Sequence, residues 1–112
     1  MNDFEVESEH TWEVILDGNG NHRKRTTKKF KKGLVEFVVV YYFGEEENRV
    51  PLVTYDTAHG FPHRDLRYLG LKDKRRKIAI YANSLEEALQ WTEGDLDRNW
   101  MTYFEEFRKT RK

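Results

Sequence analysis

The sequence predicts an α+β fold in which an antiparallel sheet of about five strands has a C-terminal helix packed on one face. Two patterns lead to this prediction. Up to about residue 82, apolar and polar residues alternate in short runs separated by Gly, Asn and Asp, whereas from residue 84 onward apolar residues return every three or four positions. A chain of 112 residues is long enough for one core, so residues 1–112 are expected to form a single domain.

The first two strands are predicted to form a hairpin. Trp12, Val14 and Leu16 alternate with mainly polar residues, and the stretch 17–20 (Asp-Gly-Asn-Gly) supplies residues that tolerate positive φ. The return arm, residues 24–30, is polar throughout most of its length. We therefore expect this arm to be an edge strand.

The segment 34–43 is the most apolar of the chain and is predicted to be the central strand. Both of its faces are largely apolar apart from Glu36, as expected for a strand with neighbours on both sides. A charged turn then leads to a fourth strand from Val50. Because Pro51 cannot donate a backbone hydrogen bond, the start of this strand is expected near an edge or a bulge.

A short strand at 66–69 and a final strand at 77–82 precede the predicted helix. Ser84 and Glu87 have the spacing of a capping box, which marks the start of the helix. Its apolar stripe consists of Leu85, Leu89, Thr92, Leu96, Trp100, Phe104 and Phe107. Gly94 allows a kink or a break within the helix. We interpret the stripe as core packing against one face of the sheet.

Charges are balanced overall but are arranged in blocks. The two basic stretches are Arg23, Lys24, Arg25, Lys28, Lys29, Lys31 and Lys32, and Arg64, Arg67, Lys72, Lys74, Arg75, Arg76 and Lys77. If both stretches fold onto one face, that face attracts phosphate. The alternative interpretation is a pair of solvated edge strands that their cations protect against aggregation.

Composition also narrows the class of protein. The chain has no cysteine, which removes disulfides, thiolate catalysis and sulfur-ligated zinc. The longest apolar run, residues 37–43, is too short to cross a bilayer, and the N-terminal residues lack the apolar core of a signal peptide. We therefore expect a cytoplasmic protein without membrane contact.

The segment 55–65 gathers more functional groups than any other part of the chain. Its sequence is Tyr55-Asp56-Thr57-Ala58-His59-Gly60-Phe61-Pro62-His63-Arg64-Asp65. Gly60 and Pro62 favour a turn, so the two histidines are expected on a bend rather than on a helix. This segment is the candidate site.

The residue types of this segment fit metal-free RNA cleavage. His59 and His63 can act as acid and base, because an imidazole exchanges protons near neutral pH. Arg64 can neutralise the charge that develops on a phosphorane. Tyr55 or Asp56 can orient an imidazole.

Two other interpretations of the segment stay open. A metal ion could be held by both histidines together with Asp56 or Asp65. Alternatively, the residues are structural, with Asp56 capping the turn, Asp65 paired with Arg64 and the histidines bonded to the backbone.

The same segment resembles the "YD-x-AHG-x-x-H-x-H" core of small TumE-family toxins. The matching residues are Tyr55, Asp56, Ala58, His59, Gly60 and His63, and Asp65 stands where the pattern has a further histidine. The match covers about eleven residues closely and, beyond them, only the general strand order and the C-terminal helix. The resemblance implies a cytoplasmic toxin of a toxin–antitoxin pair that a DNA-binding partner holds inactive.

The leading hypothesis is a toxin-like protein that acts on RNA as a metal-independent ribonuclease without a cofactor. Its catalytic residues are expected to be Tyr55, Asp56, His59 and His63, and its phosphate-binding residues Arg64, Arg67, Lys28 and Lys29. The expected partners are RNA and an antitoxin protein.

Two alternative functions stay open beside it. One is a non-catalytic interaction module that binds a protein partner or a second copy of the chain through the aromatic residues of its helix, Trp91, Trp100, Tyr103, Phe104 and Phe107. The other is a metal-dependent hydrolase. Whether the chain is an enzyme is left undecided by its sequence.

Overall fold

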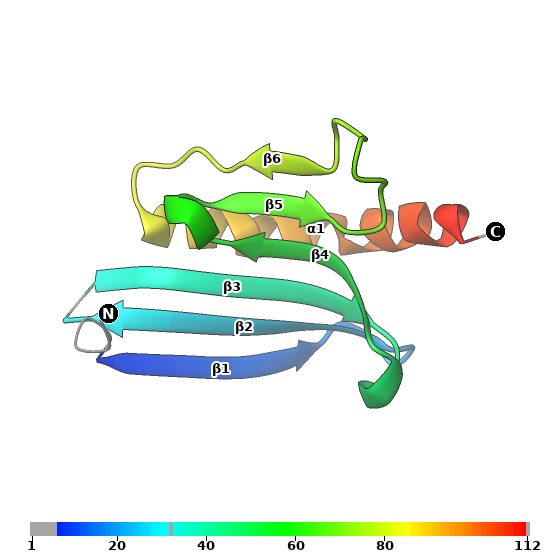
Figure 1. Ribbon diagram of the computed structural model, residues 1–112. Helices are drawn as coiled ribbons and strands as arrows, with labels where there is room; N and C mark the ends of the chain where they lie inside the picture. Colours follow the sequence, from blue (N-terminus) through cyan, green and yellow to red (C-terminus); the bar gives the residue numbers. More distant parts are fainter. Residues whose placement is uncertain (1–6, 32, 112) are drawn as a thin grey trace.

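Six strands lie side by side in chain order and form one antiparallel sheet in the described part of the chain (Figure 1). The computed structural model describes residues 7–31 and 33–111, and the side chain of His59 also lies outside the described part. The strands are β1 (Ser8–Ile15), β2 (Asn21–Phe30), β3 (Gly33–Phe43), β4 (Val50–Asp56), β5 (His63–Leu66) and β6 (Lys77–Ala79). The helical segments are η2 (Glu46–Asn48), η3 (Ala58–Gly60) and α1 (Leu85–Thr110). The predicted α+β fold is confirmed, with six strands where about five were expected.

Helix α1 lies along one face of the sheet, and no described element covers the opposite face (Figure 1). The helix contacts β3 and β4 most closely. Strands β1 and β2 extend beyond it on one side (Figure 1). The sheet therefore has a covered face, an uncovered face and an overhanging β1–β2 ribbon.

The core lies between the helix and the middle of the sheet. In β3, Phe37, Val39 and Tyr41 alternate with Val38 and Val40, and these three are completely buried on the covered face whereas the two valines are half-buried on the other. Each such side chain contributes about 1.5–3 kcal/mol through burial. The full set of buried apolar residues is Leu34, Phe37, Val39, Tyr41, Leu52, Val53, Tyr55, Leu66, Ile80, Ala88, Leu96, Tyr103 and Phe107.

Four aromatic residues of α1 pack in or against this core, namely Trp100, Tyr103, Phe104 and Phe107, whereas Trp91 is 36% exposed. The rings of Phe43 and Phe104 lie with centroids 4.9 Å apart, and Tyr41 meets Trp100 edge to face at 6.1 Å. The interpretation of the helical stripe as core packing is confirmed.

Strand β2 is not an edge strand, so that expectation was wrong. It lies between β1 and β3, and β1 forms the edge. Its polar character has two causes. On the covered face, Arg23 and Arg25 form ion pairs with Glu93 of α1, and on the uncovered face Lys28 pairs with Glu36 at 3.4 Å. Long cationic side chains with acidic partners take the place of apolar packing here.

Strand β4 begins at a bulge, as Pro51 predicts. The β3–β4 register shifts between Tyr41 and Tyr42, and Pro51 is the partner of Tyr42. The following strand begins earlier than expected, because β5 spans His63–Leu66 and the predicted strand at 66–69 is mainly a turn.

Helix α1 begins at the predicted cap. Ser84 Oγ accepts a hydrogen bond from the Glu87 N–H at 3.1 Å, and Glu87 Oε1 accepts one from the Asn83 N–H at 3.2 Å. The helix runs without a break through Gly94, because its buried stripe continues on both sides of that residue with Thr92 and Leu96. Within the described part of the chain, no helix combines the length and apolar character that a membrane span requires.

Gly44 is the position where the fold depends most directly on glycine. Its φ is 115°, and a Cβ added there would lie 2.7 Å from the carbonyl oxygen of Asn48. We predict that Gly44→Ala lowers the free energy of unfolding by about 1–3 kcal/mol, because a side chain is strained at this φ and clashes with the backbone. Denaturant unfolding measures the change. Gly18→Ala is the control, since no atom lies within 4 Å of its added Cβ, and an equal effect of both changes would contradict the prediction.

Candidate functional site

The sheet divides the predicted site between its two faces. Tyr55 is opposite Arg64 in the β4–β5 register, and Asp56 is opposite His63. Because successive side chains of a strand point to opposite faces, the first pair lies on the covered face and the second on the uncovered face. Tyr55 therefore does not orient the imidazole of His63.

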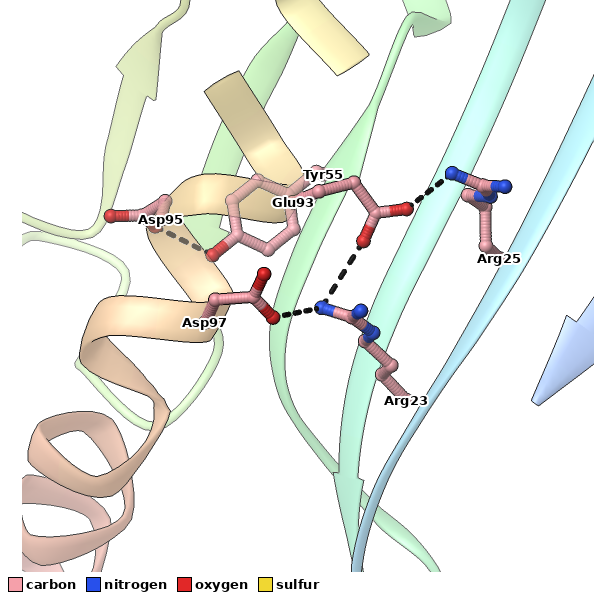
Figure 2. A network of polar contacts seen from close by, with 6 residues as sticks. All are labelled: Arg23, Arg25, Tyr55, Glu93, Asp95 and Asp97. Atoms are coloured by element: carbon pink, nitrogen blue, oxygen red, sulfur yellow. Dashed lines mark hydrogen bonds and ion pairs between the residues drawn. The ribbon is translucent and has the colours of Figure 1, made fainter. Parts of the chain in front are cut away.

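On the covered face, Tyr55 belongs to a buried hydrogen-bond network around Asp95 of α1 (Figure 2). The hydroxyls of Tyr55 and Tyr103 both donate to Asp95 Oδ2, at 2.6 and 2.7 Å, and Asn99 Nδ2 donates to Oδ1 at 2.9 Å. Arg64 Nη1 donates to the Tyr103 hydroxyl at 3.1 Å. Asp95 is only 5% exposed, so these donors replace its lost water.

This network has a structural role, and we call Asp95 with its donors Tyr55, Tyr103 and Asn99 the Asp95 clamp. Burial, followed by the neighbouring Asp95 carboxylate, raises the pKa of Tyr55 above its ordinary value. Burial and the hydrogen bond to Asp95 likewise raise the pKa of Tyr103. Both phenols thus stay protonated near neutral pH, and each donates a hydrogen bond to Asp95. Arg64 supplies a nearby positive charge, and its buried Nε has no hydrogen-bond partner among the described residues.

On the uncovered face, Asp56 and His63 occupy the remaining part of the predicted site. Asp56 Oδ1 accepts a hydrogen bond from the Ala58 N–H at 3.1 Å, which is the turn-capping role of the structural interpretation. The His63 ring is half-buried and lies against Phe61, with ring centroids 4.9 Å apart. The predicted pairing of His63 with His59 involves a side chain outside the described residues.

The ion-pair partner of Asp65 also differs from the one that the structural interpretation predicts. It pairs with Arg76, whose Nε lies 2.9 Å from Asp65 Oδ1, rather than with Arg64. Among the described side chains, no group of three or more histidine and acidic residues is arranged to hold a metal ion.

The four predicted phosphate-binding residues are not gathered in one place. Lys28 and Lys29 lie on β2, whereas Arg64 lies on β5 and Arg67 follows it. Strands β2 and β5 are separated by β3 and β4, a distance of roughly 14 Å across the sheet. Lys28 points to the uncovered face, and Arg64 to the covered one. These four residues therefore do not form one phosphate-binding face.

A second polar cluster, which the sequence analysis missed, joins β2 to the helix (Figure 2). Glu93 forms ion pairs with both Arg25 and Arg23, and Arg23 Nη1 also lies 2.9 Å from Asp97 Oδ1. The side chains involved are partly buried, except for that of Asp97. The signal was present in the sequence as matched spacings, with two arginines on one strand face and two acids one helical turn apart.

Beside this cluster, the overhanging ribbon and α1 enclose a groove of about 570 Å³. The groove is lined by Trp12, Arg25, Thr27, Lys29, Leu34, Glu86, Leu89, Gln90, Glu93, Gly94 and Asp97. Trp12 forms its outer wall, with the Arg25 guanidinium 3.8 Å from the ring centroid. Glu86 Oε2 accepts a hydrogen bond from the Leu34 N–H at 3.0 Å, and this bond lowers the pKa of Glu86.

The clamp around Asp95 generates a prediction about stability. Tyr55→Phe removes a donor to a buried carboxylate and should lower the free energy of unfolding at neutral pH by about 1–3 kcal/mol. Because the pKa of Tyr55 is raised in the folded state, the stability that Tyr55 contributes is fully present below pH about 10 and falls as pH rises further. The variant should lose less stability across this range.

Denaturant unfolding at neutral pH and above pH about 10 measures both effects. Tyr81→Phe is the control, because Tyr81 is 88% exposed. Equal stability of the Tyr55→Phe variant and the wild type would show that the clamp contributes nothing.

The resemblance of the segment 55–65 to TumE-family toxins stays a prediction. Comparison with curated proteins gave no match, and comparison with solved structures gave none either. Residues 6–112 match the family described as "Domain of unknown function (DUF7718)", and the chain therefore belongs to that family.

Proposed function

We propose that this protein is a non-catalytic interaction module that accepts an extended segment of a protein partner along the outer edge of β1. The observation that carries the proposal is the length of this unpaired edge and the exposure of its large apolar side chains. β1 is eight residues long, and Trp12, Val14 and Ile15 are 40%, 38% and 78% exposed on it. Natural edge strands are usually short, bulged or covered, because they otherwise pair with other chains. A long edge with large apolar side chains suits the addition of a strand.

The backbone of β1 presents the required hydrogen-bonding groups. Leu16 N–H donates to the Asn21 carbonyl at 2.8 Å, and Leu16 follows β1 in the same ladder with β2. Because inward and outward groups alternate along an antiparallel strand, the even-numbered residues of β1 bond to β2. The residues whose N–H and C=O groups point away from the sheet are Glu9, Thr11, Glu13 and Ile15. In the described part of the chain, no strand pairs with them.

The groove supports the same proposal. It lies on the covered side of the β1–β2 ribbon, directly beside Trp12. An added strand would place every second side chain on that side of the sheet. Those side chains would approach Trp12, at the outer side of the groove. Backbone pairing would supply affinity, and the groove would supply preference for particular side chains.

A second candidate function, RNA cleavage by a toxin-like protein, is favoured by one observation. Asp56 and His63 are directly opposite each other on the uncovered face. In this hypothesis His63 transfers a proton, Asp56 orients its ring, and His59 is the second acid–base group. Tyr55 and Arg64 have no part in it, since both are held on the covered face.

The interaction proposal is tested by Thr11→Pro. The Thr11 N–H points away from β2, so proline leaves the β1–β2 ladder intact but removes an outward donor and obstructs an added strand. Affinity capture from cell extract with tagged protein should lose the bound partner at least about tenfold, which corresponds to the loss of one or two net hydrogen bonds and their geometry. Thr11→Ala is the matched control, because both changes remove the Thr11–Thr26 hydroxyl contact but alanine keeps the N–H. Capture of the same proteins by both variants would overturn the proposal.

The RNA hypothesis is tested with purified protein and RNA, in the presence and absence of EDTA. His63→Ala and His59→Ala should each lower the cleavage rate by about 10²–10⁴-fold, the usual contribution of a general acid or base. His10→Ala is the control, because His10 is exposed on β1, away from the segment 55–65. Absence of cleavage, or cleavage that the His63 change leaves intact, would remove this hypothesis.

A further inference from the structure

We propose that the segment accepted by β1 is β1 of a second copy of this chain, so that two sheets join into one through a two-fold axis. This inference rests on the proposed function and names the partner for it. It is carried by the sequence of the edge, which can pair with a second copy over the whole stretch 9–15 without placing like charges directly opposite each other. A closed two-fold pairing also covers the β1 edges of both copies at once.

The phase of the backbone restricts the registers that are available. In each copy the outward groups belong to Glu9, Thr11, Glu13 and Ile15, so odd-numbered residues must lie opposite odd-numbered residues. In the register centred on Trp12, Thr11 lies opposite Glu13, and Glu9 lies opposite Ile15. The whole stretch from Glu9 to Ile15 is then paired.

Charge selects this register over its neighbours. Centring the pair on Thr11 would put Glu9 opposite Glu13 twice, and centring it on Glu13 would put that glutamate opposite its own copy. Like charges directly opposite each other destabilise a strand pair. The Trp12-centred register has no such pair within the stretch 9–15, which sets it apart from both adjacent registers.

The side chains of the covered face complete the interface. Trp12 lies opposite its own copy at a non-hydrogen-bonded position, where the two Cα atoms are about 4.5 Å apart and the side chains approach closely. Cross-strand aromatic pairs are among the favourable ones. His10 lies opposite Val14 on the same face. Because the two-fold axis is perpendicular to the sheet, both α1 helices lie on the same face of the joined sheet. The two grooves then meet at the pair of tryptophans.

Sedimentation equilibrium of the purified chain tests the association. The wild type and Thr11→Ala should be dimers, and Thr11→Pro should weaken the dimer by at least about tenfold in dissociation constant, because two backbone hydrogen bonds are lost across the axis. Circular dichroism and denaturant unfolding verify that both variants remain folded.

Cysteine cross-linking tests the register, and the absence of native cysteine makes each product unambiguous. Thr11→Cys and Glu13→Cys both lie on the uncovered face of β1, away from the groove. A mixture of the two variants should form the mixed disulfide at least about tenfold faster than either forms one with itself, because only residues directly opposite each other have Cβ atoms within about 5.5 Å. Preferred 11–11 or 13–13 cross-links would assign a different register and overturn the one proposed.

The results separate this inference from the proposed function. A monomeric wild type overturns the inference, and the proposed function survives if a different protein is captured by Thr11→Ala but not by Thr11→Pro. A dimer that Thr11→Pro leaves intact also overturns the inference, because the contact then lies elsewhere. If capture is also indifferent to Thr11→Pro, both proposals fail.

Discussion

The carboxylate of Asp95, held by phenols from the sheet and from the helix, is the interaction on which the rest of the structure depends. Tyr55 of β4 and Tyr103 of α1 donate hydrogen bonds to it, and Arg64 donates one to the Tyr103 hydroxyl. A buried carboxylate is costly unless several donors surround it, so the network favours the position of α1 in which these groups meet. It also holds Tyr55 and Arg64 on the covered face, away from Asp56 and His63.

Away from this clamp, the helix is narrower than the sheet it covers. Arg23 and Arg25 connect β2 to the helix by pairing with Glu93. The groove lies beside these ion pairs, between α1 and the β1–β2 ribbon. β1 lies outside this arrangement and is attached to the molecule mainly through its ladder with β2. Among the strands that the structure describes, β1 is thus the longer of the two edge strands, and it contributes least to the core. This unpaired edge is the physical basis of the proposed association along β1.

Much of the fold could be predicted from local patterns. The α+β class, the central strand with two apolar faces, the bulge at Pro51 and the cap at Ser84 all follow from side-chain period or from single-residue backbone chemistry. The position of β2 could not be predicted in the same way. A polar strand looks like an edge until its partners are known, and Glu93 lies 68 residues from Arg25 in the sequence. The spacing of the arginines and of the acids is visible in the sequence, but which of them pair is decided only by long-range packing.

The candidate site shows the same limit. From sequence alone, the two-residue period already implied that Tyr55 and Asp56 point to opposite faces, and glycine and proline already implied a bend between the histidines. Which face the helix would cover was decided only by tertiary packing, because alternation is identical whichever side becomes the core. That choice buried Tyr55 beside Asp95 and left Asp56 and His63 on the uncovered face. The sequence thus determined the kinds of groups and their alternation, and the packing of α1 determined which of them could act together.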